Sequence, residues 1–222
     1  MPRNQAHEGA VLLVGLGRFG GAMAEALGRL GHEVLAVDSD RTRVQEWSGR
    51  LHHVVQADTT DGEAMRQLGA SDFDLAVVAI GSGIEASILS TSVLVDLGVK
   101  QIWAKAITPA HGRILQRVGA AHVVYPESSM GERVAHLISG KILDYIEFDD
   151  GFTIVKTRAP REACNRSLAE VGLRARYGVT VIGVKRPGAD FTHATPDTVV
   201  NTGDLLIVCG SNARVENFAA TT

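Results

Sequence analysis

Apolar and polar positions alternate from residue 10 to about residue 127 in a pattern that predicts strands and helices in turn. Short β-branched runs are separated by stretches with apolar residues at helical spacing, as at Phe19, Met23, Leu27 and Leu30. Such alternation is typical of βαβ units, in which helices join parallel strands. The pattern predicts six strands, at residues 11–14, 33–37, 53–56, 75–80, 101–105 and 122–125.

Three glycines support the same fold class. Gly31, Gly98 and Gly119 each stand between a helical run and the next predicted strand. Glycine adopts a positive φ at little steric cost and therefore ends many helices. The first part of the chain is thus predicted to be an α/β domain with a Rossmann-like, doubly wound parallel sheet.

The pattern changes after Pro126. Ser128 and Ser129 can cap a helix with Glu132, and apolar residues continue at helical spacing to Leu143. This predicts a long crossover helix that leaves the sheet and joins the next unit near residues 141–150, with Gly140 either ending or kinking it.

A small α+β domain is predicted to follow. Its strands are expected at residues 152–157, 179–184 and 205–208, and one helix is expected at residues 168–177. We therefore divide the chain into a disordered tail at residues 1–8, a first domain at 9–140, and a second domain at 141–222 that includes the crossover helix region.

Composition excludes several classes of protein. The 22 Lys and Arg residues against 25 Asp and Glu give a net charge of −3, so the clustered positive surface of a nucleic-acid-binding protein is not expected. The apolar runs at residues 75–80 and 205–209 are far shorter than the roughly 20 residues that span a bilayer. Cys164 and Cys209 have no disulfide or zinc-site spacing, which favours a reducing compartment.

The segment Gly15-Leu16-Gly17-Arg18-Phe19-Gly20 fits the pattern G-x-G-x-x-G where the first strand should turn into the first helix. There the first glycine makes the turn, the second lets a pyrophosphate approach, and the third lets helix and strand pack closely. The helix N-terminus offers free N–H groups to the phosphates. The segment predicts a dinucleotide- or nucleotide-binding loop.

Asp38 ends the second predicted strand, at about the distance beyond the loop where a ribose-binding acid is expected. Its carboxylate would accept hydrogen bonds from ribose hydroxyls and repel a 2′-phosphate. This favours ATP, ADP or NAD(H) over NADP, although Arg41 nearby could instead pair with a 2′-phosphate.

Three further residues lie at the ends of predicted strands. Asp58 either belongs to a helix cap or contacts the adenine edge, and the sequence leaves both readings open. Lys105 and Glu127 are expected at the carboxyl edge of the sheet, where open α/β folds bind ligands. Together they could hold phosphate directly or through a cation.

The sequence offers no evident catalytic pair. In the second domain Cys164 and His193 are the candidates for acid–base or nucleophilic chemistry, and neither has a companion in sequence. We therefore expect a protein that is not an enzyme. An NAD-dependent oxidoreductase with an unrecognised catalytic pair remains the alternative; an NADH-sensing repressor is disfavoured because no basic recognition helix is evident.

Taken together, the ordered motifs resemble those of a known family. They are the glycine segment at residues 15–21, Asp-Ser-Asp at 38–40, Ile-Trp-Ala-Lys-Ala at 102–106, Tyr-Pro-Glu at 125–127 with Met-Gly at 130–131, and Arg-Ala-Arg-Tyr-Gly at 174–178. The chain resembles the regulatory subunit of bacterial Ktr- and Trk-type potassium-uptake systems, built from the RCK (regulator of potassium conductance) module.

The resemblance implies a cytoplasmic protein that is peripheral to the inner face of the cell membrane. It implies dimers that assemble into a homo-octameric ring on a membrane potassium pore of the KtrB or TrkH type, and gating by exchange of ATP and ADP, or of NAD(H) in some relatives. By motif position, Asp38 would hold the ribose and Arg18 the terminal phosphate, while Glu127 would place a cation, Mg²⁺ or Na⁺, beside the phosphates.

The resulting set of candidate nucleotide-binding residues is Gly15, Gly17, Arg18, Phe19, Gly20, Asp38, Ser39, Asp58, Lys105 and Glu127. In some family members cyclic di-AMP binds between two copies of the second domain. Val181, Ile182 and Arg186 could serve such a site here. Thr192 stands near the place where the family pattern has Asn, so the sequence departs from the pattern of this second site.

Overall fold

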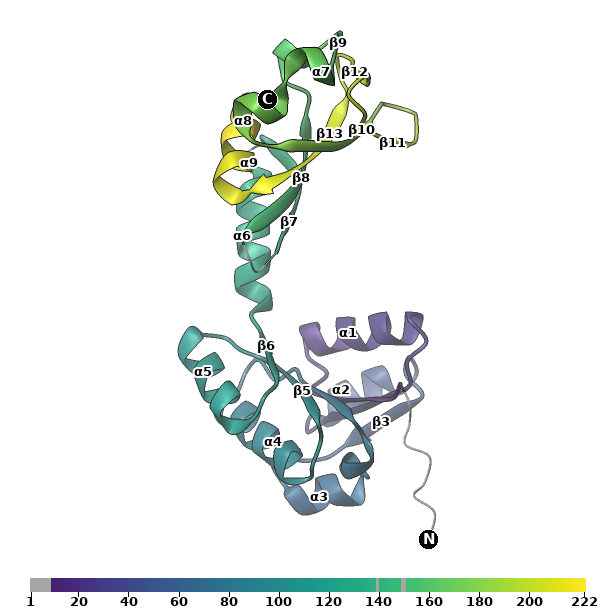
Figure 1. Ribbon diagram of the computed structural model, residues 1–222. Coiled ribbons are helices and arrows are strands. Elements are labelled where there is room, and N and C mark those ends of the chain that lie inside the picture. The colour runs from purple at the N-terminus through teal and green to yellow at the C-terminus, as the bar shows by residue number, and fades with distance from the viewer. Residues whose placement is uncertain (1–8, 139, 149–150) are drawn as a thin grey trace. The chain divides into compact units, whose positions relative to one another are not determined.

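The chain forms two compact units, whose boundary falls between Glu127 and Ser128. The computed structural model describes residues 9–138, 140–148 and 151–222 (Figure 1). The predicted tail at residues 1–8 lies outside the described residues. Helix α6 (Pro126–Ile138) spans the boundary. In the structure most of this helix belongs to the second unit. The division predicted from the sequence, at residue 140, places it in the first domain, and that division stays a prediction.

The first unit contains a six-stranded parallel sheet in the order β3-β2-β1-β4-β5-β6, as expected for a Rossmann-like fold. All six predicted strands are present, although β4 and β6 end earlier than predicted and β2 is shifted by one residue. The strands are β1 (Val11–Val14), β2 (Val34–Asp38), β3 (His53–Gln56), β4 (Leu75–Val78), β5 (Gln101–Lys105) and β6 (His122–Val124).

Helices cover both faces of this sheet. Helices α1 (Arg18–Arg29) and α2 (Arg41–Trp47) pack against one face, where Val11 and Leu13 are buried. Helices α3 (Gly62–Gln67), α4 (Ile84–Asp96) and α5 (Pro109–Val118) pack against the other, over Leu12 and Val14 (Figure 1). A short 3₁₀ turn at Ala70–Asp72 follows α3.

Helix ends in this unit follow the glycine pattern. Gly31, Gly98 and Gly119 have φ values of 87°, 84° and 124°, which confirms the positive φ expected at each helix-to-strand turn. The doubly wound arrangement places the carboxyl ends of β1, β2, β4 and β5 at one edge of the sheet.

The second unit contains an antiparallel sheet in the order β11-β10-β13-β8-β7 and a two-stranded sheet of β12 and β9. Val215 and Phe218 of α9 pack with Leu206 and Val208 in its core. The strands are β7 (Ile142–Glu147), β8 (Phe152–Arg158), β9 (Arg166–Ser167), β10 (Thr180–Lys185), β11 (Phe191–His193), β12 (Val199–Val200) and β13 (Leu205–Ser211). The helices are α6, α7 (Leu168–Val171), α8 (Leu173–Tyr177) and α9 (Asn212–Ala219), with a 3₁₀ turn at Arg161–Ala163.

The structure corrects the prediction that helix continues near residues 141–150. Helix α6 ends at Ile138, and β7 occupies Ile142–Glu147, paired with β8. The apolar residues of this edge strand fall in two adjacent pairs, Ile142–Leu143 and Tyr145–Ile146, which fit helical spacing better than the alternation of a half-buried strand.

Two other helix boundaries differ from the prediction. Helix α6 begins at Pro126 rather than after Ser128 or Ser129, because proline suits the first turn of a helix. The helix predicted at residues 168–177 is divided into α7 and α8 at Gly172, whose φ of 64° interrupts the helix.

Within the part of the chain that the structure describes, no helix combines the length and the apolar character needed to cross a membrane.

Candidate functional site

The glycine segment forms a tight turn between β1 and α1. Gly15 has a φ of 98°, and its N–H donates to the carbonyl of Val37 at 2.8 Å. A Cβ on Gly20 would lie 1.9 Å from the Gly15 carbonyl oxygen, whereas a Cβ on Gly17 would meet nothing within 4 Å. Close packing therefore requires glycine at position 20, and the backbone at position 17 is open to a ligand.

Helix α1 begins at this open backbone. Its N-cap is Gly17, and no side chain caps the N–H groups of the first turn. Uncapped N–H groups together with the helix dipole form an environment that attracts an anion. Arg18, the first residue of α1, is exposed beside this turn.

Asp38 links the end of β2 to the glycine turn. The residue is 5% exposed, and its Oδ2 accepts a hydrogen bond from the Leu16 N–H at 2.6 Å. Its Oδ1 accepts from the Asp40 N–H at 2.8 Å, and Arg43 Nη1 lies 3.4 Å from Oδ2. Two carboxylate oxygens offer about four acceptor positions, so capacity remains for a hydroxyl donor.

Lys105 and Glu127 form an ion pair at the same edge of the sheet. Lys105 Nζ lies 2.5 Å from Glu127 Oε1 and 5.6 Å from the centre of the Phe19 ring. The pKa of Glu127 is lowered chiefly by the hydrogen bond from Lys105, with further help from the charges of Lys105 and Arg18, and burial opposes this only in part. Glu127 is therefore ionised at neutral pH.

The other predicted site residues are held in local turns. Asp58 accepts hydrogen bonds from the N–H and the hydroxyl of Thr60, at 2.9 and 2.7 Å, and these bonds lower its pKa. The predicted helix cap is present in the same segment, with Asp61 as the residue that caps α3. The carbonyl of Ser39 accepts from Gln56 Nε2 at 3.2 Å.

The carboxylate of Glu127 is the predicted cation ligand, and the structure directs it to Lys105. Among the described residues, no group of three or more His, Cys, Asp or Glu side chains could enclose a metal ion. A cation beside Glu127 would therefore take most of its ligands from a bound polyphosphate and from water, as Mg²⁺ commonly does.

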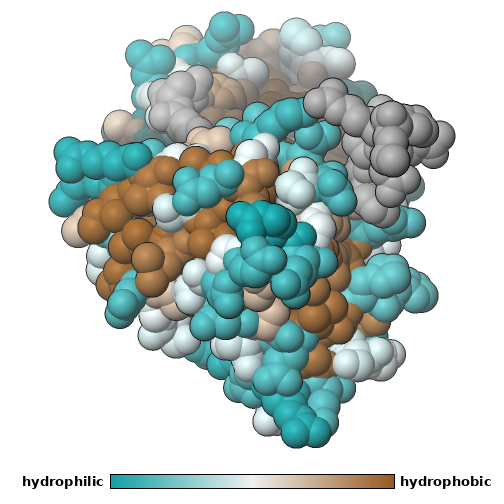
Figure 2. Space-filling model, turned by 90° about the horizontal axis from the view of Figure 1, so that it is seen from below, coloured by the Kyte–Doolittle hydropathy of each residue, from teal (hydrophilic) through white to brown (hydrophobic). Residues whose placement is uncertain are grey.

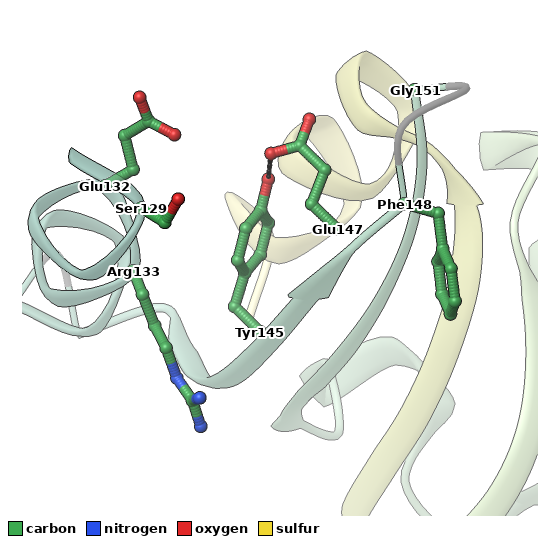
Figure 3. Close-up of a pocket in the computed structure, with 7 residues that line it drawn as sticks. All are labelled: Ser129, Glu132, Arg133, Tyr145, Glu147, Phe148 and Gly151. Atoms are coloured by element: carbon green, nitrogen blue, oxygen red, sulfur yellow. Dashed lines mark hydrogen bonds between the residues drawn. The ribbon is translucent and has the colours of Figure 1, made fainter. Parts of the chain in front are cut away.

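The second unit contains a separate pocket of about 470 Å³ that the sequence did not indicate. Figure 3 shows Ser129 and Glu132 of α6 on one side and Tyr145 and Glu147 of β7 on the other. The Tyr145 hydroxyl donates to Glu147 at 2.7 Å, and burial, reinforced by Glu147, raises the Tyr145 pKa to about 12. The sequence pattern predicts helix rather than strand β7 at these residues, so it gives no signal for this pocket.

The pocket is polar and its charged groups are partly engaged. Arg133 pairs with Asp144 at 2.7 Å, and the side chain of Asn212 donates to Glu147. The hydrogen bonds from Tyr145 and Asn212 lower the pKa of Glu147, so its charge persists at neutral pH. These contacts fasten α6 and α9 to β7 within the second unit.

The two candidate catalytic residues, Cys164 and His193, contact different neighbours. Cys164 Sγ contacts the Pro160 carbonyl at 3.6 Å, and the His193 ring lies edge-on to Phe191. Neither contact forms the acid–base or nucleophilic pair that the oxidoreductase alternative requires.

The residues predicted for cyclic di-AMP also have partners of their own. Arg186 donates to the Val199 carbonyl at 3.2 Å and lies 3.7 Å from Asp204, while the Thr192 hydroxyl bonds to the Val184 carbonyl at 3.3 Å. Val181 packs against the core of the unit, whereas Ile182 is exposed.

Comparison with protein families gives two matches in order along the chain. The TrkA-N domain matches residues 11–126, and the TrkA-C domain matches residues 152–221. The Ktr system potassium uptake protein C of Bacillus subtilis is 37% identical over 207 residues, which cover 93% of this chain and 94% of the relative.

Solved structures show the same fold. The crystal structure of the GsuK RCK domain superimposes with a TM-score of 0.66 at 18% identity, over 100% of this chain and 48% of that chain. This chain therefore spans about half the length of that protein. A crystal structure of GsuK bound to ADP has a TM-score of 0.53 at 25% identity, over 62% of this chain and 35% of that chain.

Proposed function

The chain belongs to the family of Ktr-type potassium uptake proteins that join a TrkA-N domain to a TrkA-C domain, and from this we propose that it is the regulatory, gating subunit of a potassium transporter. In this proposal the first unit binds ATP or ADP, and the exchange of one for the other controls a membrane potassium pore. The protein performs no catalysis of its own.

One observation carries the nucleotide-binding part of the proposal. The buried carboxylate of Asp38 is fixed at 2.6 Å from the N–H of Leu16, inside the glycine turn that opens α1. An adenosine ribose at Asp38 therefore brings its phosphates to the uncapped N-terminus of that helix. The ADP-bound GsuK structure supports the choice of nucleotide, and NAD(H) shares the same adenosine half.

The proposal also includes a physical route from ligand to gating. A ligand shifts a two-state assembly only by the difference in its affinity for the two states. ATP and ADP differ by one phosphate group, so a charged contact with that group in one state supplies such a difference. Arg18, exposed beside the glycine turn, is the residue we propose for this contact, and Glu127 with Mg²⁺ or Na⁺ is a second candidate.

We propose that several copies of the chain assemble into a ring, an octamer built from dimers, on a pore subunit of the KtrB or TrkH type. The protein would then act at the inner face of the membrane through its partner. The name of the Bacillus relative supports a role in potassium uptake. Cyclic di-AMP in the second unit remains a weaker proposal, because Arg186 is already paired within its own unit.

Isothermal calorimetry with ATP, ADP and NADH tests the proposed function. We expect the parent protein to bind ATP or ADP and the Asp38→Ala variant to bind neither measurably. The matched control is Asp74→Ala, which removes an exposed acid paired with Lys100 just before β4, at the opposite edge of the sheet. Undiminished affinity in Asp38→Ala, or loss of affinity in Asp74→Ala, would contradict the assignment of the site.

A further inference from the structure

The ion pair between Lys105 and Glu127 is unequal in its exposure to solvent. The Lys105 side chain is 9% exposed and the Glu127 side chain 67%. A buried ammonium group is costly unless an anion accompanies it, whereas an exposed carboxylate is hydrated almost as well without its partner. The pair can therefore exchange its carboxylate for another anion far more easily than it can lose the ammonium group.

Three segments around the glycine turn hold the Lys105 ammonium group in place. Lys105 is the last residue of β5. Its Nζ lies over the ring of Phe19 in the first turn of α1, and a Cβ on Gly81, in the segment between β4 and α4, would lie 2.9 Å from that Nζ. Glycine at position 81 thus leaves room for this lysine. The ammonium group is consequently positioned beside the helix N-terminus that attracts an anion.

Glu127 provides the anionic oxygen that pairs with the Lys105 ammonium group. It accepts the hydrogen bond from Lys105 at 2.5 Å, and it approaches the site from the first turn of α6 rather than from the sheet. A polyphosphate drawn to the uncapped N–H groups of α1 therefore meets a lysine whose charge is already neutralised by Glu127.

We propose that Lys105 is a phosphate-binding residue that Glu127 masks, so that nucleotide phosphate and Glu127 compete for one ammonium group. This inference rests on the proposed nucleotide-binding function and adds its regulation. In the absence of a coordinated cation, Glu127 opposes binding instead of assisting it. Phosphate binding releases the acid from Lys105 and with it the contact that holds Glu127, in the first turn of α6, to the end of β5.

Calorimetric titration with ATP in the presence of EDTA tests the competition. We expect Glu127→Gln to bind ATP about tenfold more tightly than the parent, a change of about 1.4 kcal/mol, and Lys105→Met to bind it more weakly. In the double variant the gain should vanish, because its source is the unmasked lysine. Glu132→Gln, an exposed acid on the same helix, is the matched control and should bind like the parent.

Hydrogen exchange at the start of α6 gives a second readout that does not depend on the folding of the lysine variant. ATP should speed exchange at residues 128–132 in the parent, and Glu127→Gln should show the faster exchange before ATP is added. Equal or weaker ATP binding by Glu127→Gln in EDTA would overturn the inference, as would a gain that persists in the double variant.

These outcomes are separable from failure of the proposed function. If the parent binds ATP and Asp38→Ala does not, the nucleotide site stands, and the behaviour of Glu127→Gln then decides the masking role alone. If the parent binds neither ATP nor ADP, the proposed function fails, and the inference fails with it.

Discussion

A buried histidine makes the stability of the first unit depend on pH. His111, near the start of α5, is 1% exposed, and its Nδ1 accepts a hydrogen bond from the Ile107 N–H at 3.3 Å. Burial disfavours the charged ring and lowers its pKa from the ordinary value of 6.5. In the unfolded chain the ring regains the ordinary pKa.

We predict that the free energy of unfolding of the first unit falls as the pH drops below 6.5. Below pH 6.5 His111 binds a proton in the unfolded chain but not in the folded chain, so protonation favours unfolding. The free energy of unfolding stops falling once the pH is below the lowered pKa of the folded chain. Urea denaturation at about pH 7.5 and about pH 5.5 measures it, and His111→Asn should show a smaller fall between them.

The control for this prediction is His52→Asn, because His52 is exposed. Its urea midpoint should follow the pH dependence of the parent. If His111→Asn keeps the full pH dependence as well, the effect has another source and the role given to His111 is wrong.

At the scale of single residues, the sequence predicts best what the backbone alone dictates. The spacing of Gly15, Gly17 and Gly20 implies a turn, and the structure has it because a side chain at Gly20 would overlap the Gly15 carbonyl. The sequence also places Lys105 and Glu127 at one edge. Their ion pair could not be predicted, since it depends on the side-chain directions of β5 and α6.

Among the elements, two glycines of the second unit should respond in opposite ways to the same substitution. Gly172 separates α7 from α8 with a φ of 64°, a conformation that costs an L-residue about 1 kcal/mol. Gly131 lies inside α6, and a Cβ there would meet nothing within 4 Å. An alanine there favours helix by roughly 0.5–1 kcal/mol.

We therefore expect Gly172→Ala to lower the free energy of unfolding of the second unit by about 1 kcal/mol and Gly131→Ala to raise it by a similar or smaller amount. Urea titrations followed by circular dichroism measure both, and each variant serves as the control for the other. A stabilised Gly172→Ala would mean that α7 and α8 can fuse into the single helix predicted from the sequence.

The elements that escaped prediction share a physical cause. Strands β1, β2 and β4 of the first unit are largely buried and almost continuous in apolar residues, so their pattern is strong. Strand β7 is an edge strand whose Tyr145, Ile146 and Glu147 mix apolar and polar side chains. Its antiparallel pairing with the next strand, β8, decides its conformation, and apolar spacing does not reveal that pairing. The short strands β9 and β12 pair with each other across a long stretch of sequence, whereas the short strand β11 forms a hairpin with β10.

For the whole molecule, the proposed ring requires surface that binds another copy of the chain. Helix α4 has exposed apolar side chains outside its buried side: Leu94 packs into the core, whereas Ile84, Leu89 and Val95 are exposed. Ile114 of the adjoining α5 is exposed as well. Figure 2 shows bands of hydrophobic surface on the side of the first unit seen from below. Apolar side chains gathered on an exposed surface often mark a site of contact with another protein.

We predict that Leu89→Glu weakens self-association, because it places a charge where the proposed assembly buries an apolar side chain. Loss of a buried leucine contact alone is worth about 1.5–3 kcal/mol, or roughly 10- to 100-fold in the association constant at each interface. Sedimentation velocity of the full chain at several concentrations measures the shift toward smaller species.

Leu30→Glu is the control, since Leu30 follows α1, on the opposite face of the sheet, and is already 75% exposed. If Leu89→Glu assembles like the parent while remaining folded, the ring must use another surface, and the apolar side of α4 needs a different partner.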